Sequence, residues 1–140
     1  MNFLNPITNV RTYGSDPEMV KKCGLAYMRG AKECSSAVAV KHFPGDGVDE
    51  CDQHILTSVN SLSCEEWDKT YGDIYQTLID HGALTVMVGH IAMPAYQKKY
   101  NPNHPDKLMP ATLSPELLQN LLREKLGFNG MIIRSEEHTS

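Results

Sequence analysis

The side chains best suited to acid–base chemistry lie in residues 37–54, AVAVKHFPGDGVDECDQH. The apolar, β-branched start of this segment predicts a buried strand of a parallel sheet. Lys41 and His42 follow it, and a Gly-rich turn leads into an acidic loop that contains Asp52 and His54. Histidine exchanges protons near neutral pH, and a neighbouring carboxylate can fix its tautomer and stabilise the imidazolium. Polar groups where a buried strand gives way to a loop indicate a catalytic or binding site in an α/β fold.

Two further side chains are candidates for the same site. Arg11 is the cation of an irregular N-terminal segment, and His90 follows a second apolar segment, LTVMVG. An ordinary surface charge is an equal interpretation of Arg11. A hydrogen-bonded structural histidine is at least as good an interpretation of His90 as a substrate contact.

The loop that contains Asp52 and His54 also has plainer interpretations. It could be a solvated surface loop without a chemical role. A metal-binding module built on His42, Asp52 and His54 is a weaker alternative, because the sequence fixes no complete ligand set. We expect no metal.

Composition and charge indicate a soluble globular protein. The 140 residues are 41% hydrophobic and 21% charged, which suits one ordinary domain or part of a larger one. The net charge of −4 argues against nucleic acid or an anionic membrane as the main partner. No apolar run reaches the roughly 20 residues that span a bilayer. The four cysteines lack Cys-x-x-Cys spacing, so we expect reduced thiols and a cytoplasmic location.

Three helix-start signals alternate with three short apolar segments. Each start combines a good N-cap residue with a proline or a capping box, and apolar residues then recur at helical spacing. The sequence predicts, in chain order, a helix from Asp16 to Gly30, a strand over 37–40, a helix from Ser63 to Gly82, a strand over 84–89, a helix from Ser114 to Gly127, and a strand from Gly130.

This alternation predicts the α/β class, with a parallel sheet covered by helices on both faces. Three strands are few for such a sheet, so the fold looks incomplete. Residues 91–112 are rich in Pro, Asn and Lys, and their length predicts a polar active-site loop.

Three motifs resemble a known family. They are Lys41-His42-Phe43-Pro44-Gly45 with the spaced Asp-x-His that follows, RTYGSDP at residues 11–17, and PATLSPELLQNLLREKLGFNGMII at residues 110–133. Together they resemble the family 3 glycoside hydrolases, and within that family the β-N-acetylglucosaminidase branch. The resemblance covers residues from about 5 to 133. It implies that residues 1–133 are part of the N-terminal (β/α)8 TIM barrel of that family, with the active site at the carboxyl ends of the strands.

The resemblance also implies the chemistry. It predicts a retaining hydrolase (β-N-acetylhexosaminidase) that removes terminal, non-reducing β-N-acetylglucosamine through a covalent glycosyl-enzyme. His54 would be the general acid/base and Asp52 its orienting partner, while Arg11, Lys41 and His42 would bind the sugar. The substrates would be small-molecule or oligosaccharide N-acetylglucosaminides, cell-wall muropeptides among the candidates, and no cofactor is implied. A β-glucosidase of the same family and a non-catalytic sugar-binding remnant are the alternatives.

The sequence departs from the family pattern at three positions. Asp46 stands where many relatives carry histidine, and Gln53 replaces the usual Ser or Thr. Ser135 occupies the place of the nucleophilic aspartate, and serine supplies no carboxylate, so we expect the chain as written to be inactive. RSEEHTS is also the translation of a common sequencing adapter. We therefore interpret residues 134–140 as a non-native tail on a truncated chain.

Overall fold

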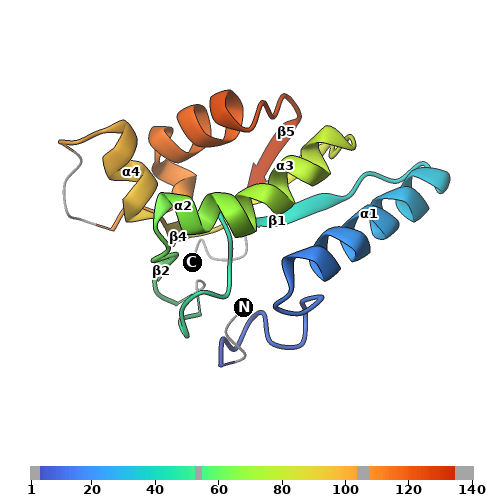
Figure 1. The fold of residues 1–140 in the computed structure, drawn as a ribbon, viewed down its shortest axis with the longest axis horizontal. Coiled ribbons are helices and arrows are strands. Elements are labelled where there is room, and N and C mark those ends of the chain that lie inside the picture. The colour runs from blue at the N-terminus through green and yellow to red at the C-terminus, as the bar shows by residue number, and fades with distance from the viewer. Residues whose placement is uncertain (1–3, 53–54, 104–107, 135–140) are drawn as a thin grey trace.

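The computed structural model describes residues 4–52, 55–103 and 108–134. Helices and strands alternate along the chain, as Figure 1 shows. The elements are α1 (Pro17–Glu33), β1 (Ala39–Phe43), β2 (Ser58–Val59), α2 (Cys64–Trp67), the π-helical η1 (Asp68–Gly72), α3 (Asp73–Asp80), β3 (Thr85–Val88), β4 (Ile91–Ala92), α4 (Pro94–Tyr100), the 3-10 helix η2 (Ala111–Leu113), the π-helical η3 (Glu116–Lys125) and β5 (Met131–Arg134).

The central sheet is parallel, which confirms the predicted α/β class. Its order is β1-β3-β5, so the three strands follow one another in space as they do in sequence. Ala39 pairs with Thr85, and Thr85 in turn pairs with Met131. β2 and β4 form a separate, two-stranded parallel pair.

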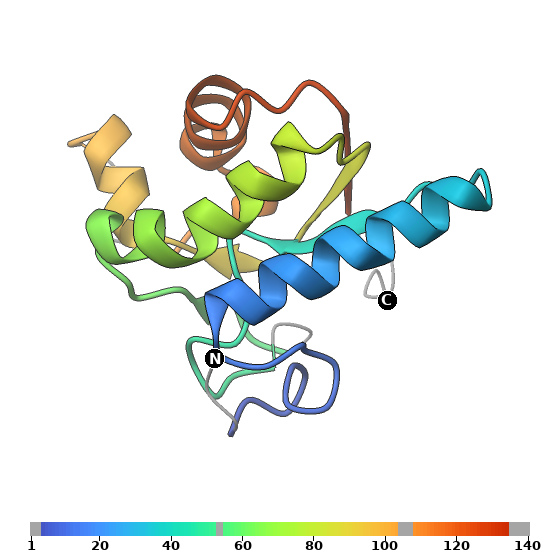
Figure 2. The same ribbon diagram turned by 45° about the vertical axis from the view of Figure 1, so that its right-hand side comes forward.

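The helices lie along one side of the central sheet, as the two views in Figures 1 and 2 show. Val86 and Val88 of β3 are buried against them, whereas Thr85 and Met87 on the opposite face are half-buried. The expectation that helices cover both faces is therefore wrong for the described residues. The reason is that α1, α3 and η3 all lie on the face of the sheet that carries Val86 and Val88.

An aromatic cluster forms the core between β1 and the helices. Phe43 and Tyr75 meet edge-on with ring centroids 5.3 Å apart, and Trp67 meets Tyr96 in the same way at 5.4 Å. Trp67 and Tyr96 are fully buried. Such pairs add about 0.5–1.5 kcal/mol each beyond the burial of apolar area. Trp67 and Tyr75 therefore belong to the hydrophobic core.

Two of the three predicted helix starts are confirmed by their caps, whereas η3 begins at Glu116, two residues after the predicted Ser114, with no side-chain cap hydrogen bond. The Asp16 carboxylate accepts from the backbone N–H of Glu18, and Ser63 and Glu66 form the expected capping box. The predicted end of α1 at Gly30 is wrong, because the helix continues to Glu33. The left-handed conformation that follows belongs to Ser35, with φ 55°, rather than to a glycine.

The strands differ slightly from their predicted bounds. β1 begins two residues later than expected and runs through Lys41 and His42 to Phe43. β5 includes Arg134, which the sequence assigned to the non-native tail. A shift of one or two residues at an element end is usual, and the end of β1 is displaced by three.

The polar loop predicted over residues 91–112 is instead regular structure for most of its described length. This stretch contains β4, α4 and η2. Met93 and Tyr96 are fully buried, and the Gln97 side chain donates a hydrogen bond from Nε2 to the Met109 carbonyl at 2.9 Å. The buried side chains order the segment despite its polar composition.

Candidate active site

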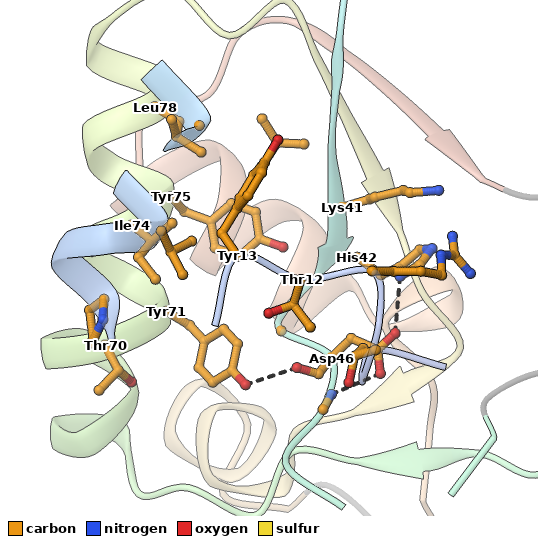
Figure 3. A pocket seen from close by; sticks show the side chains of 18 of the residues that line it. Thr12, Tyr13, Lys41, His42, Asp46, Thr70, Tyr71, Ile74, Tyr75 and Leu78 are labelled. Carbon is orange, nitrogen blue, oxygen red and sulfur yellow. Dashed lines mark hydrogen bonds and ion pairs between the residues drawn. The ribbon is translucent and has the colours of Figure 1, made fainter. Parts of the chain in front are cut away.

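A cavity of about 730 Å³ lies between the N-terminal segment, α1, β1 and α3. Arg11, Lys41 and His42 all line it, so the structure brings the three predicted sugar-binding residues to one cavity. Lys41 and Arg11 are exposed, while the His42 side chain is 13% exposed. Figure 3 shows Lys41 and His42 at the end of β1. The cavity offers positive charge and hydrogen-bonding groups to a polar ligand.

The end of β1 is irregular where it carries His42. Lys41 pairs with Met87 and Phe43 pairs with the next residue, Val88, so the register shifts across His42. An extra residue in a strand redirects the side chains beside it, and such bulges are frequent next to active sites.

His42 is paired with a buried carboxylate. Its Nδ1 lies 3.0 Å from Oδ2 of Asp46, whose side chain is 5% exposed (Figure 3). The other carboxylate oxygen of Asp46 accepts the backbone N–H of Gly47 at 2.8 Å. Sequence reasoning noted Asp46 as a departure from the family pattern and missed this contact, although a carboxylate four residues after a histidine across a Gly-rich turn was a usable signal.

The turn that carries Asp46 is held by its backbone carbonyls. Three consecutive carbonyl oxygens each accept a hydrogen bond from a side chain in a later segment of the chain. The pairs are Pro44 with Trp67 Nε1 at 2.6 Å, Gly45 with Asn60 Nδ2 at 3.1 Å, and Asp46 with the Tyr71 hydroxyl at 2.8 Å. Three side-chain hydrogen bonds therefore hold the backbone of the turn in place.

Tyr71 also restricts which residue the turn can contain. Gly45 has a φ of 132°, and a Cβ atom there would lie 2.4 Å from the Tyr71 ring. Burial raises the pKa of the Tyr71 hydroxyl well above its ordinary value, and the Asp46 and Asp49 carboxylates add to the rise. The hydroxyl therefore remains a proton donor to the turn at neutral pH.

The acidic loop is anchored just before Asp52. The Asp49 carboxylate accepts from the Ser58 hydroxyl at 2.5 Å and from the backbone N–H of Val59 at 2.6 Å. Fully buried Asn5 donates from Nδ2 to the carbonyls of Asp49 at 2.9 Å and Cys51 at 3.3 Å. Sequence reasoning missed Asn5 and Asp49 because their partners lie far along the chain or on the backbone.

The predicted acid/base pair is only partly within the described residues. Asp52 is half-buried, and its carbonyl accepts from the backbone N–H groups of Ile55 and Leu56 at 3.0 Å each. Asp52 does not line the cavity. His54 and Gln53 lie outside the described residues, as does Ser135, so their predicted roles stay predictions.

His90 does not join the other candidates. Its Nδ1 lies 3.2 Å from the Thr112 hydroxyl, and the residue is absent from the cavity wall. Within the described parts of the chain, no three His, Cys, Asp or Glu side chains come together as metal ligands. The helices of the same parts include none that is long and apolar enough to cross a bilayer.

A parallel α/β sheet with a cavity that reaches Lys41 and His42 near the carboxyl end of a strand fits enzymes that bind ligands at the carboxyl ends of their strands. Residues 2–137 match the family model described as the glycosyl hydrolase family 3 N terminal domain. The chain belongs to glycosyl hydrolase family 3, as its motifs predicted.

Two curated relatives illustrate the similarity. A β-N-acetylglucosaminidase/β-glucosidase of Cellulomonas fimi is 48% identical over 134 residues, which cover 95% of this chain and 24% of the relative. A β-hexosaminidase of Nitrosomonas eutropha is 30% identical, covering 90% of this chain and 33% of the relative. The chain thus spans about a quarter to a third of these proteins.

Solved structures show the same relationship. The β-glucoside phosphorylase BglX is 51% identical and superposes with a TM-score of 0.94, over 96% of this chain and 24% of that protein. A family 3 β-N-acetylglucosaminidase from Paenibacillus sp. is 32% identical with a TM-score of 0.85, again over 96% and 24%.

Proposed function

We propose that the protein containing this chain is a retaining glycosidase that releases terminal β-N-acetylglucosamine from small or oligosaccharide N-acetylglucosaminides. The observation that carries the proposal is the lining of the cavity, which includes Arg11, Lys41 and His42, with the buried Asp46 carboxylate bonded to the His42 ring. Sugars are bound through networks of hydroxyl hydrogen bonds, and this lining supplies both charged and neutral partners for them. The hexosaminidase names of several relatives support the choice of sugar.

Within this proposal, His54 is the general acid/base and Asp52 orients its ring. Most glycosidases use two carboxylates, so a histidine acid is a variation on the usual pair. The anchors formed by Asn5 and Asp49 support the assignment, because they fix the backbone of the loop immediately before Asp52. Residues 1–133 would be part of a (β/α)8 barrel, residues 134–140 a non-native tail, and the setting cytoplasmic, with muropeptides as candidate substrates.

The acid role is tested by leaving-group dependence in the full-length enzyme. His54→Ala should lower kcat/KM by about 10²–10⁴-fold for an alkyl N-acetylglucosaminide, whose leaving group needs a proton. The loss should be far smaller for a dinitrophenyl glycoside, whose leaving group does not. His81→Ala, which removes an exposed histidine bonded to the Thr77 carbonyl, is the matched control. Equal losses on both substrates would contradict the role.

A β-glucosidase activity is the nearest alternative, and the double name of the Cellulomonas fimi relative favours keeping it. Nitrophenyl glucoside and its N-acetyl analogue, compared on the same full-length enzyme, would distinguish the two. A non-catalytic sugar-binding remnant would bind N-acetylglucosamine as this chain alone and cleave neither substrate.

Phosphorolysis is a second candidate reaction. The solved structure at 51% identity is described as a β-glucoside phosphorylase, whereas the β-N-acetylglucosaminidase structure is 32% identical. In phosphorolysis a phosphate oxygen, in place of water, attacks the anomeric carbon as the bond from sugar to enzyme breaks. Arg11 and Lys41 bring positive charge to the same cavity. Product analysis with and without inorganic phosphate decides, since phosphorolysis yields the sugar 1-phosphate and hydrolysis yields the free sugar.

A further inference from the structure

The buried Asp46 carboxylate has a specific relation to the His42 ring. A buried carboxylate is costly unless its oxygens are hydrogen-bonded. Here Oδ1 accepts the Gly47 N–H and Oδ2 lies 3.0 Å from His42 Nδ1. Because a carboxylate only accepts, Nδ1 must carry a proton. This holds for the neutral ring and for the imidazolium alike.

The remaining ring nitrogen, Nε2, is then fixed in its role. With Nδ1 protonated, the Nε2 atom of a neutral ring is an acceptor, and His42 lines the cavity. A sugar hydroxyl that reaches His42 therefore finds a ring whose tautomer is already set. The three carbonyl contacts that hold the Pro44–Asp46 turn keep the carboxylate in place.

We propose that Asp46 is a positioning residue that sets the tautomer of His42 and thereby which hydroxyl pattern of the sugar the cavity accepts. The inference rests on the proposed function for its substrate class. It goes beyond that function by assigning a role to the residue at which this chain departs from the family pattern.

Asp46→Asn is the sharpest variant for testing the role. It keeps the size of the side chain but has one acceptor oxygen where aspartate has two. If that oxygen continues to accept the Gly47 N–H, the amide NH2 faces His42 Nδ1 and demands an unprotonated nitrogen. The proton would then move to Nε2, and the ring would offer a donor to the sugar in place of an acceptor.

In the full-length enzyme, Asp46→Asn should lower kcat/KM by about 10–100-fold, by analogy with the cost of changing a carboxylate that orients a metal-ligating histidine. The loss should shrink for the one monodeoxy N-acetylglucosaminide that lacks the hydroxyl which His42 contacts. In a double-mutant cycle, His42→Ala with Asp46→Asn should cost little more than His42→Ala alone.

Asp49→Asn is the matched control, because Asp49 is an aspartate held by two donors and has no recorded contact with His42. The decrease in kcat/KM caused by Asp49→Asn should add to the decrease caused by His42→Ala. Two outcomes would overturn the proposal. One is that the losses of kcat/KM from Asp46→Asn and His42→Ala are additive. The other is that Asp46→Asn lowers kcat/KM equally on every deoxy analogue.

A second measurement does not depend on any variant folding. Ring ¹⁵N chemical shifts of His42 in the wild-type enzyme should report a proton on Nδ1, and a neutral Nε2–H tautomer would refute the proposal. Glycoside cleavage by the wild-type enzyme separates the proposed function from the proposed role of Asp46. An enzyme that cleaves no glycoside but binds the sugar with the Nδ1–H tautomer would contradict the proposed function and leave the role of Asp46 standing.

Discussion

The two walls of the cavity differ in how firmly they are held. On one side, the Pro44–Asp46 turn has every backbone carbonyl bound by a side chain from a later element. On the other side is α1, a helix described along its whole length in which no residue is fully buried. Tyr27 of this helix is 63% exposed even though it lines the cavity. Lys41 and His42, the β1 residues proposed to contact the sugar, lie just before the firmly held Pro44–Asp46 turn.

The difference is visible in two glycines. A Cβ at Gly45 would lie 2.4 Å from the Tyr71 ring, and its φ of 132° is unfavourable to any other residue. A Cβ at Gly24, in α1, would lie 3.0 Å from a methyl carbon at the far end of the flexible Leu78 side chain. The same substitution should therefore have opposite consequences on the two walls.

The largest effect is expected for Gly45→Ala. Strain at a positive φ and the clash with Tyr71 should together lower the free energy of unfolding by about 2–5 kcal/mol. Urea denaturation of the full-length enzyme, followed by circular dichroism, measures it. Measured in a Tyr71→Ala background, the same Gly45→Ala substitution should cost less, because the clash is absent there. A Gly45→Ala variant as stable as the wild type would show that the turn is not rigid.

Tyr71→Phe should have an intermediate effect. It removes the hydroxyl that donates to the Asp46 carbonyl and leaves that buried oxygen without this donor. The expected cost is about 1–3 kcal/mol in the free energy of unfolding. Tyr13→Phe, which changes a half-exposed tyrosine elsewhere on the cavity, serves as a control and should change stability little. Equal effects of the two variants would contradict the importance of the turn contacts.

Gly24→Ala should be neutral or stabilising. Alanine favours a helix interior over glycine by up to about 1 kcal/mol, and the neighbouring Leu78 methyl can move aside. The thermal midpoint of unfolding measures the change. A clear loss of stability would show that α1 is packed as tightly against α3 as the turn is against Tyr71, and the contrast between the walls would fail.

The smallest effect is expected for Lys21→Gln in α1. Hydrogen bonds to Asp73 and Glu18 raise the pKa of the Lys21 ammonium above its ordinary value of 10.5. A raised pKa means that the pair contributes stability below pH 10.5 and loses it as the pH rises through the folded-state pKa. Wild type and variant should differ slightly at neutral pH and low salt, and converge at high salt or high pH. A difference that grows with pH would contradict this.

The sequence predicted best what depends on local contacts. The N-cap at Asp16 and the capping box of Ser63 and Glu66 involve partners three residues away or fewer, so the local sequence pattern was enough to predict them. α4 was missed because it is ordered by distant burial, with Tyr96 packed against Trp67.

The same division holds in the candidate site. Arg11, Lys41 and His42 were candidates from their residue types and positions, the motif resemblance made them sugar binders, and they share a cavity. Asn5 and Asn60 were not found, because each binds backbone carbonyls 15 or more residues away, and side-chain type alone does not reveal such partners. The alternation of helices and apolar strands predicted the α/β class, and polar residues after a buried strand predicted a site, whereas the family resemblance added the barrel and the sugar-binding roles.

The position of β3 determines how long this part of the molecule resists exchange with solvent. Within the described sheet β3 is paired on both sides, whereas β1 and β5 are each paired on one. Its amides should exchange their hydrogens for deuterium through opening of the whole sheet, more slowly than those of the two-residue strands β2 and β4. The Gly89 N–H just beyond β3 donates to the Phe43 carbonyl at 2.9 Å, so the Gly89 amide should share this slow exchange, with its acceptor next to His42 in the chain.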